Sequence, residues 1–354
     1  KSYSMMYVNF SKMVKLTFSG VMFACMKILV TGATGFLGSR LLESLSGIDT
    51  YTHIIASGRT KRDSAVSHSK IHYLLGDLTD MEYVRGIVQG VDCIVHAAAL
   101  SSPWGTDDAF EKANVISMKN LISASLEENV KRLVFISTPS LYFKLSDSTN
   151  IKESDQLPRP INSYARTKRM AEILLEESGI PYVILRPRAL IGRGDTVILP
   201  RLIHAHLQGK LAMIGRGENM VDLTPVSNVV DAIVLSLSAS GPALNQTYNI
   251  SNGDPVMLWD KIQMIFERLN LPGLTKKVPL PIAITVARMM EFKAKISSSK
   301  KEPTLTVYGV GTLAKTFTLN IDKARDLLGY CPKLSVDDAV DEYIFWQKEL
   351  KNVN

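Results

Sequence analysis

The chain has 354 residues, of which 46% are apolar and 21% charged, and it carries a formal net charge of +7. A chain of this length and apolar content can form a large globular core. Its charges are spread along the sequence rather than gathered in a basic stripe, which argues against nucleic-acid binding. The three cysteines are scattered and lack zinc-ligand spacing, so we predict free thiols in a reducing, cytoplasmic compartment: Cys25, Cys93 and Cys331.

Residues 1–25 differ from the rest of the chain. Two lysines precede a short apolar run, residues 16–25, that superficially resembles the apolar part of a signal peptide. The run is too short to cross a bilayer, and a strand pattern begins directly after it at Met26. We therefore expect either that Met26 is the functional start or that residues 1–25 form a leader outside the fold.

From Met26 onward, short apolar runs alternate with segments that carry apolar residues every three or four positions. The runs are almost continuously apolar, as in strands buried on both faces. This alternation predicts an α/β fold with a Rossmann-type, doubly wound parallel sheet and right-handed crossovers. The expected strands are residues 28–31, 53–57, 93–97, 133–137 and 182–186, and the expected helices are residues 37–45, 81–89, 110–128 and 164–178.

The pattern becomes less regular after Pro187, which predicts a smaller second lobe over the open ends of the strands. We assign residues 26–187 to a dinucleotide-binding domain, to which residues 226–250 return, and residues 188–354 mainly to a substrate-binding lobe. Ligands of such folds bind outside the carboxyl ends of the strands, so this lobe should supply the substrate pocket.

A glycine-rich turn, Thr-Gly-Ala-Thr-Gly-Phe-Leu-Gly, follows the first expected strand. Its first two glycines are three residues apart, which departs from the usual dinucleotide-binding spacing. The turn still permits a tight exit from the strand, close approach of a pyrophosphate, and close packing of the next helix. An ordinary strand-to-helix connection is the alternative. The residues expected to contact the cofactor here are Gly32, Thr34, Gly35, Phe36, Leu37 and Gly38.

The second expected strand ends in a basic segment, residues 57–62, that contains no acid. An acid here would bind the adenosine ribose of NAD, whereas guanidinium groups suit the 2′-phosphate of NADP. We therefore predict NADP(H) as the preferred cofactor, with NAD(H) possible, and assign the phosphate to Arg59 with help from Ser57 and Arg62. A solvated basic loop is the alternative. Further cofactor contacts are expected at Asp77, Leu78, Ala97, Ala98, Ala99 and Pro187.

Tyr164 and Lys168 stand four residues apart in one expected helix, so the ammonium should lie one turn from the phenol. A free phenol, with a pKa of about 10, is a poor base at neutral pH. A neighbouring cation favours the phenolate and makes the group usable for proton transfer. This spacing is common in structural helices, but together with the upstream glycine turn it predicts a catalytic tyrosine beside a nicotinamide cofactor.

The order of motifs along the chain resembles that of the extended short-chain dehydrogenase/reductase superfamily. The motifs are the glycine turn, Gly-Asp-Leu at 76–78, His-Ala-Ala-Ala at 96–99, residues 137–142, the Tyr164 and Lys168 pair, and Arg186-Pro187. Residues 194–201, 221–231 and 308–322 make the chain similar to the 3β-hydroxysteroid dehydrogenase branch, which includes bacterial 2-alkyl-3-ketoalkanoate reductases. The resemblance implies an oxidoreductase that interconverts a ketone and a secondary alcohol on a bulky apolar substrate, either steroid-like or a long-chain 3-keto acid.

The resemblance also implies a mechanism in which the nicotinamide delivers hydride to the ketone carbon while Tyr164 gives its proton to the oxygen. Thr138, four residues before Tyr142, would hydrogen-bond that oxygen, with Ser137 and Ser140 as alternatives. Lys168 would lower the pKa of the tyrosine and hold the nicotinamide ribose. Asn114 would either continue a water relay or simply pack its helix.

The substrate pocket is expected to include Ser101, Trp104 and Ser140, with Trp104 either stacking on the substrate or anchoring the lobe. Residues 281–301 combine apolar residues at helical spacing with lysines, which predicts weak membrane contact or a core-facing helix with solvated lysines. The six histidines form no metal-binding pattern, so no metal is expected. The resemblance implies a homodimer formed through the helices over residues 110–128 and 164–178.

Two other functions use the same motifs. A nucleotide-sugar epimerase or dehydratase would recycle its cofactor internally, and a redox sensor would bind the dinucleotide without turnover. Sensors of this type usually lose the tyrosine and lysine pair, which is present here. Sugar-nucleotide enzymes usually carry a basic residue just before the position of Asp222, where this chain has Met220 and Val221. Charge for a diphosphate could come instead from Arg193, Arg201 or Arg216.

Overall fold

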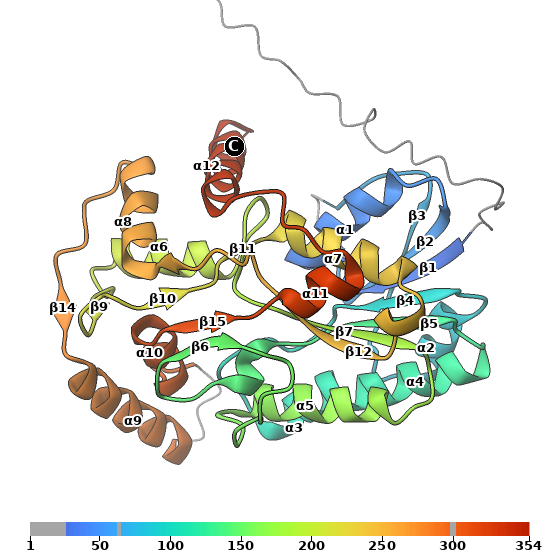
Figure 1. Ribbon diagram of the computed structural model, residues 1–354, viewed down its shortest axis with the longest axis horizontal. Helices are drawn as coiled ribbons and strands as arrows, with labels where there is room; N and C mark the ends of the chain where they lie inside the picture. The colour runs from blue at the N-terminus through green and yellow to red at the C-terminus, as the bar shows by residue number, and fades with distance from the viewer. Residues whose placement is uncertain (1–25, 62–64, 298–301, 354) are drawn as a thin grey trace, which may run out of the picture.

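The computed structural model describes residues 26–61, 65–297 and 302–353. A parallel seven-stranded sheet with the order β12-β7-β5-β4-β1-β2-β3 forms its centre (Figure 1). The strands are β1 (Met26–Thr31), β2 (Tyr51–Gly58), β3 (Ile71–Leu75), β4 (Cys93–His96), β5 (Arg132–Ile136), β7 (Tyr182–Pro187) and β12 (Gln246–Ile250). This architecture confirms the predicted Rossmann-type doubly wound sheet. The proposed leader, residues 1–25, lies outside the described residues.

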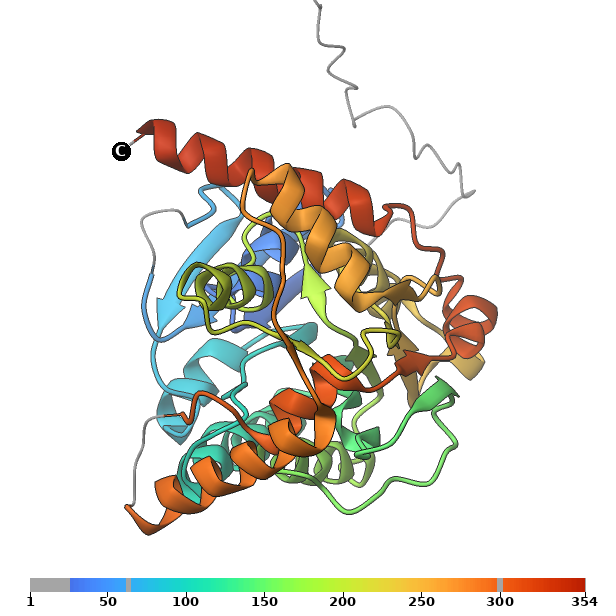
Figure 2. The same cartoon turned by 90° about the vertical axis from the view of Figure 1, so that its left-hand side faces the viewer.

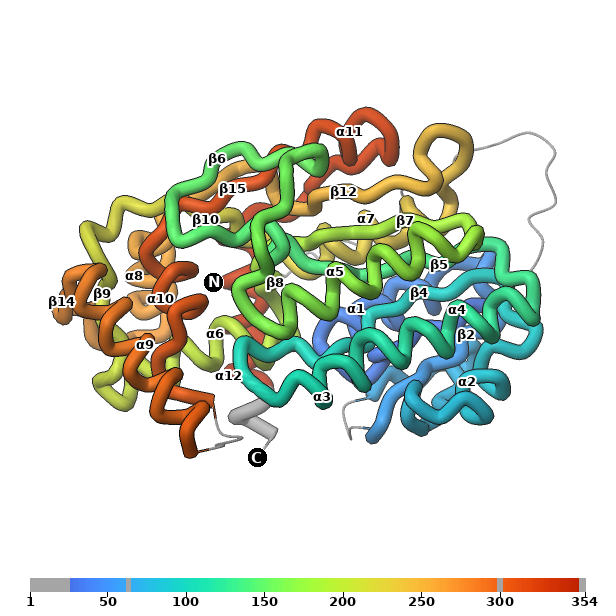
Figure 3. Tube along the Cα trace, turned by 90° about the horizontal axis from the view of Figure 1, so that it is seen from below, coloured from blue at the N-terminus to red at the C-terminus, as the bar shows by residue number. Residues whose placement is uncertain are grey.

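Helices cover both faces of the sheet, as Figures 1 and 3 show. One face carries α1 (Phe36–Ser46), α7 (Val226–Ser238) and α11 (Asp322–Leu328), and the other carries α2 (Met81–Val88), α4 (Ser117–Glu127) and α5 (Ser163–Glu176). Successive residues of β1 contribute to different cores, with Ile28 and Val30 in the first and Leu29 in the second. Burial on both faces explains why the strand runs are continuously apolar.

The helix expected over residues 110–128 is divided into three parts. A short helix α3 (Asp107–Phe110) leads into a π-helical segment, η2 (Glu111–Ile116), and then into α4. The π-helical segment contains Asn114, whose buried amide accepts a hydrogen bond from Leu100 N at 2.8 Å and donates to Thr167 Oγ1 at 3.0 Å. Apolar spacing alone does not reveal such a local change of helical pitch.

Smaller sheets lie beyond the open ends of the central strands. The four-stranded one has the order β13-β10-β15-β6 and consists of β6 (Ser148–Ile151), β10 (Met220–Val221), β13 (Val256–Met257) and β15 (Phe317–Leu319). The two-stranded sheets pair β8 (Leu190–Ile191) with β11 (Thr224–Pro225) and β9 (Met213–Ile214) with β14 (Lys277–Val278). In this region lie α6 (Ile198–Leu207), α8 (Leu258–Arg268), α9 (Leu280–Ile296), α10 (Val307–Ala314) and α12 (Val336–Val353) (Figure 1). None of the helices in the described chain is long and apolar enough to cross a bilayer.

The order of the central strands places the sequence motifs at one edge. The order runs β1, β2, β3 in one direction and β1, β4, β5 in the other, so the switch point lies between β1 and β4. The glycine turn follows β1, and the alanines at 97–99 follow β4. Ligands bind at such a switch point in open α/β sheets.

Candidate active site

The backbone of the glycine turn leaves no room for a Cβ atom at Gly32 or Gly38. Gly32 has a φ of +69°, and a Cβ atom there would lie 2.6 Å from the backbone nitrogen of Ala98. A Cβ atom on Gly38 would overlap the carbonyl oxygen of Gly32. Gly35 is the N-cap residue of α1, and no side chain caps this helix end. The first amides of α1, from Phe36, Leu37 and Gly38, therefore suit an anion such as a pyrophosphate.

The strand ends on either side of the switch point are joined through Thr31. Its carbonyl accepts a hydrogen bond from Ala97 N at 3.2 Å, and its hydroxyl is bonded to His96 Nδ1 at 2.7 Å and Ala98 N at 3.3 Å. Burial, with the nearby charge of Lys168, lowers the pKa of His96 to about 3. His96 is therefore neutral, and small uncharged groups form this side of the crevice.

The residues expected at the adenosine end lie at the ends of β2 and β3. Arg59 is exposed, and its charge is close enough to contribute to the lowered pKa of Asp77, although hydrogen bonds from Thr79 contribute more. Thr34 packs against Gly58, where a Cβ atom would lie 2.7 Å from the threonine hydroxyl. Leu78 accepts a hydrogen bond from Asn120 through its carbonyl at 3.0 Å. Arg62 lies outside the described residues.

Ser57 is less suited to phosphate binding than its sequence position indicated. Its buried hydroxyl is bonded to Tyr83 OH at 2.8 Å, and Tyr83 OH donates its hydrogen to Leu74 O at 2.6 Å. Because a phenol has only one hydrogen, Ser57 must be the donor to Tyr83. Its hydroxyl hydrogen is thus already used, and the phosphate assignment rests on Arg59.

Tyr164 lies in the first turn of α5, which starts with Asn162 accepting a hydrogen bond from Ala165 N at 2.9 Å. Its phenol is hydrogen-bonded to the side chains of Ser101 and Thr138. Burial raises the pKa of Tyr164, while these two hydrogen bonds act to lower it. The structure therefore brings together three residues that the sequence assigned separately to catalysis and substrate binding.

The side chain of Lys168 is held against β5. Its buried ammonium donates to Ile136 O at 2.6 Å and lies 3.9 Å from the centre of the Phe135 ring. Burial lowers the pKa of Lys168 to about 7, against the opposing effect of Glu172. In this structure the contributions that lower the pKa of Tyr164 come from Ser101 and Thr138, and the effect of Lys168 on the phenol stays a prediction.

A line of hydroxyl groups connects the phenol with the second lobe. Thr138 accepts a hydrogen bond from Ser140 N at 3.2 Å, and its hydroxyl donates to Ser140 Oγ at 3.0 Å. Ser140 Oγ is in turn bonded to Tyr308 OH at 2.7 Å. Tyr308, on α10, was not expected in the site, although it lies in a motif that carried the family resemblance. The bonds of Asn114 described above favour its packing role.

Glu172 follows Lys168 by one turn of α5 and is fully buried. It forms a buried ion pair with Arg186 at 2.6 Å, accepts a hydrogen bond from Ser137 Oγ at 2.6 Å, and contacts Arg169 at 3.0 Å. Burial raises its pKa, but Arg186, Ser137 and Arg169 together hold the pKa below its usual value. This cluster fixes α5, and with it Tyr164, against β5 and β7, and the sequence did not predict it.

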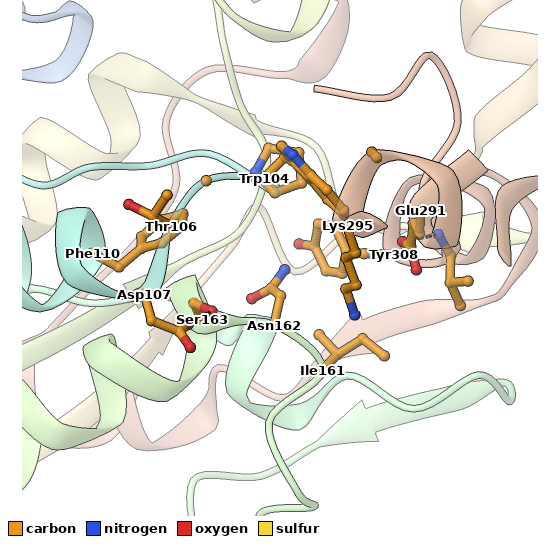
Figure 4. A pocket seen from close by; sticks show the side chains of 14 residues that line it. Trp104, Thr106, Asp107, Phe110, Ile161, Asn162, Ser163, Glu291, Lys295 and Tyr308 are labelled. Atoms are coloured by element: carbon orange, nitrogen blue, oxygen red, sulfur yellow. Dashed lines mark hydrogen bonds between the residues drawn. The ribbon is translucent and has the colours of Figure 1, made fainter. Parts of the chain in front are cut away.

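A pocket of about 440 Å³ lies at the start of α5 and beside Tyr308 of α10 (Figure 4). Asn162 and Ser163 at its edge directly precede Tyr164, and Tyr308 connects it to Ser140. Its charged lining residues are Asp107, Glu291 and Lys295. The remaining lining residues are Pro103, Trp104, Gly105, Thr106, Phe110, Ile161, Ala294 and Val307. Trp104 thus lies where a substrate contact was expected, and the described residues hold no group of metal-ligating side chains.

Comparison with known proteins identifies the family of the chain. The family model described as NAD dependent epimerase/dehydratase family matches residues 28–251. A 2-alkyl-3-oxoalkanoate reductase of Stenotrophomonas maltophilia is 30% identical over 89% of this chain and 97% of its own. A 3beta-hydroxysteroid-dehydrogenase/decarboxylase of Arabidopsis thaliana is also 30% identical, over 92% of this chain and 80% of its own.

The fold also resembles solved structures. The UDP-glucuronic acid 4-epimerase of Bacillus cereus, solved in complex with NAD, has a TM-score of 0.73 at 24% identity over 92% of this chain and 99% of its own. The resemblance to the 3β-hydroxysteroid dehydrogenase branch is confirmed by the relatives, and so is the class of NAD-dependent dehydrogenase or reductase. The chain belongs to the NAD dependent epimerase/dehydratase family, and its glycine turn, Tyr164 and Lys168 all lie within the matched residues.

Proposed function

We propose that the protein interconverts a ketone and a secondary alcohol on a bulky apolar substrate with a 3-oxo or 3-hydroxy carboxylic acid group. The observation that carries this proposal is the phenol of Tyr164, hydrogen-bonded to Ser101 and Thr138. The two residues before Tyr164, Asn162 and Ser163, line a pocket together with Trp104, Phe110 and Ile161. The phenol can transfer a proton to an oxygen placed beside it, and the aromatic and aliphatic lining suits an apolar body.

In the reductive direction, a nicotinamide cofactor held at the glycine turn would supply the hydride that converts the carbonyl into a secondary alcohol. Tyr164 donates its proton to the oxygen, and Thr138 donates a hydrogen bond to the same oxygen once its hydroxyl turns away from Ser140. Tyr308 OH can then donate to Ser140 Oγ, and Ser140 Oγ can donate to Thr138 Oγ1, because either hydroxyl of the Ser140 and Tyr308 pair can be the donor. A chain of hydroxyls that all donate toward the oxygen stabilises its negative charge more than one does.

The position of Lys295 is the reason for proposing a carboxylate on the substrate. Lys295 lines the pocket on α9, and its charge makes a minor contribution to the lowered pKa of Asp107, although the described residues form no ion pair with it. The pocket carboxylates have other contacts, because Asp107 binds Arg166 and Glu291 accepts a hydrogen bond from Val307 N at 2.8 Å. A relative named for a 3-oxoalkanoate substrate also acts on a carboxylate. Figure 4 shows the Lys295 side chain crossing the pocket toward Ile161.

Replacement of Lys295 should raise KM for keto acids but leave KM for neutral ketones almost unchanged. We expect Lys295→Met to raise KM for a 2-alkyl-3-oxo acid about tenfold, because a charge-assisted hydrogen bond is lost. KM for the methyl ester of the same acid should change less than about twofold. Lys293→Met is the matched control, since Lys293 is exposed on the same helix but does not line the pocket. Equal KM changes for acid and ester would remove Lys295 from carboxylate binding.

The main alternative, a nucleotide-sugar epimerase or dehydratase, is supported by the fold of the Bacillus cereus epimerase. Its diphosphate would need cations near the pocket. Two of the three candidates are already paired, Arg193 with Glu43 and Arg201 with Glu302. Met220 and Val221 supply no charge before Asp222, and Val221 is buried. These contacts favour the apolar ketone over the sugar nucleotide, and likewise the intact site favours an enzyme over a redox sensor.

The test is turnover of NADPH and NADH with a 2-alkyl-3-oxo acid, a 3-ketosteroid and UDP-glucuronate. Steady NADPH consumption with either ketone is the expected result. Conversion of the sugar nucleotide without net cofactor consumption would instead assign the protein to the epimerases. Tight cofactor binding without turnover of any substrate would point to a sensor.

We propose NADP(H) as the preferred cofactor, on the basis of the cation at the end of β2 and the lack of an acid there. We expect Arg59→Ala to raise KM for NADPH about tenfold or more, since one charge-assisted contact to the 2′-phosphate is worth ~1.5–3 kcal/mol. KM for NADH should be almost unchanged. Lys61→Ala is the control, because the Lys61 ammonium lies over the Tyr73 ring, 4.6 Å from its centre. Equal effects on both cofactors would contradict the assignment.

We further propose a cytoplasmic homodimer that binds no nucleic acid. The helices expected at the dimer interface carry exposed apolar side chains at Ile116, Met170 and Ile173. Sedimentation equilibrium tests the dimer, and these three residues are the positions at which to disrupt it. Cys93 and Cys331 are unpaired, which supports a reducing compartment.

A further inference from the structure

Helix α9 has its larger apolar side chains on the outside. Its buried residues are the small Ala283 and Ala287, which pack against Val310 of α10. Its exposed apolar residues, called here the α9 stripe, are Ile282 (56% exposed), Val286 (39%), Met289 (67%), Phe292 (67%) and Ile296 (69%). They recur every three or four positions and so form one line along the helix. A surface helix normally has the opposite arrangement, with its polar side toward solvent.

The charges in the segment that carries the α9 stripe are almost all positive. Residues 276–297 contain five cations and one carboxylate, for a formal net charge of +4. The single carboxylate, Glu291, faces α10 and accepts the hydrogen bond from Val307. The cations are Lys276, Lys277, Arg288, Lys293 and Lys295, all of them exposed. Figures 1 and 2 show α9 at the rim of the molecule, with α10 on its inner side.

We propose that α9 is a membrane-surface helix that binds an anionic bilayer through the α9 stripe. An apolar line flanked by lysine and arginine is the pattern by which helices lie in the interface, ~5–10 Å into the boundary between headgroups and acyl chains. Each nearby cation adds attraction to the negative lipid headgroups. The helix lies on the bilayer and does not cross it, in agreement with the hydropathy of the described helices.

A second copy of the chain fits the α9 stripe less well. In a two-fold symmetric contact, the same surface patch would face itself, so the +4 segment of one copy would oppose the +4 segment of the other. Like charges that face each other across an interface weaken association. An anionic lipid surface supplies the opposite charge.

Binding in this orientation would place the pocket beside the bilayer. The edge of α9 that lines the pocket consists of Glu291, Ala294 and Lys295, and the α9 stripe runs along its outer side. A lipid-like substrate could then pass from the acyl chains to the pocket without entering water. Only this delivery step rests on the proposed function, whereas membrane binding itself does not.

The test is co-sedimentation of the full chain with vesicles of phosphatidylcholine, either pure or with about a third phosphatidylglycerol. The changed protein is Phe292→Gln/Ile296→Gln, and the matched control is Phe345→Gln/Leu207→Gln, which alters apolar residues of similar exposure on α12 and α6. We expect wild type and control to bind the anionic vesicles, and the α9 variant to bind at least tenfold more weakly. Binding should weaken at high salt, because charges are screened.

Absence of wild-type binding to the anionic vesicles, or equal binding of both variants, would overturn the proposal. So would a change of oligomeric state that accompanies Phe292→Gln/Ile296→Gln in sedimentation equilibrium, because the α9 stripe would then be a contact between copies. The vesicle assay needs neither substrate nor cofactor. Its outcome is therefore independent of the turnover measurements that test the proposed function, and the α9 variant should reduce a water-soluble ketone as fast as wild type does.

Discussion

Tyr164→Phe should lower kcat by roughly 10²–10⁴-fold while leaving cofactor affinity nearly unchanged, as expected for loss of a general acid. Phenylalanine preserves the ring and its packing but cannot donate a proton to the substrate oxygen. The raised pKa of Tyr164 keeps the phenol protonated at neutral pH, which suits a proton donor in the reductive direction. Steady-state kinetics with NADPH and titration of NADPH fluorescence measure the two quantities separately.

The control for this experiment is Tyr308→Phe, which removes the hydroxyl at the other end of the same line of hydrogen bonds. Tyr308 bonds Ser140 and not the phenol, so it acts as a positioning residue. We expect this variant to lose much less activity than Tyr164→Phe, on the order of threefold to tenfold, as for one hydrogen bond. Retention of kcat in Tyr164→Phe would remove Tyr164 from the chemical step, and equal losses in the two variants would point to a shared structural role.

Glu172→Gln should lower the free energy of unfolding by ~3–5 kcal/mol, because it leaves the guanidinium of Arg186 buried without a counter-charge. The Arg186 side chain is only 4% exposed and that of Glu172 is fully buried. A glutamine keeps the shape of the side chain and part of its hydrogen bonding, so the loss reports on the charge. Urea denaturation followed by circular dichroism measures it.

Glu176→Gln is the matched control for the buried pair. Glu176 also binds Arg169, at 3.3 Å, but its side chain is 30% exposed, so its loss should cost less than about 1 kcal/mol. The pKa of Glu172 is lowered in the fold from its usual 4.5, so its stabilising effect is present above that pH and is lost as the pH falls through the folded-state value. Equal destabilisation by the two variants would show that the buried pair contributes no more than the exposed one.

The sequence predicted the parts of the fold that depend on local patterns. Continuous apolar runs identified five of the seven central strands, all except β3 and β12. The glycine turn lies at the switch point of the sheet, where close backbone approach requires Gly32 and Gly38. Short strands such as β10 and β15 were not expected, since a run of two or three residues has no readable periodicity. Their pairing depends on segments that are distant in the chain.

The chemical details of the site depend on packing, and for this reason the sequence predicted them less well. Spacing on α5 placed Lys168 near Tyr164, but the ammonium turns to Ile136 O and the Phe135 ring. The hydroxyl of Ser57 is used by Tyr83, which comes from a helix later in the chain. Tyr308 reaches Ser140 from a position 168 residues further along the chain, and no local pattern predicts such a contact.

The pairing of β6 with β15 has a consequence for the order in which the enzyme becomes active during synthesis. β6 lies between the loop that carries Thr138 and the helix that carries Tyr164, yet its backbone bonds with residues 316–320, as in Ser148 N to Thr316 O at 2.9 Å. Chains fold as they emerge from the ribosome, N-terminal parts first. The Rossmann strands can assemble early, but β6, which follows the Thr138 loop, gains its pairing partner only after residue 320 has left the exit tunnel. Nascent chains should therefore bind cofactor before they can catalyse.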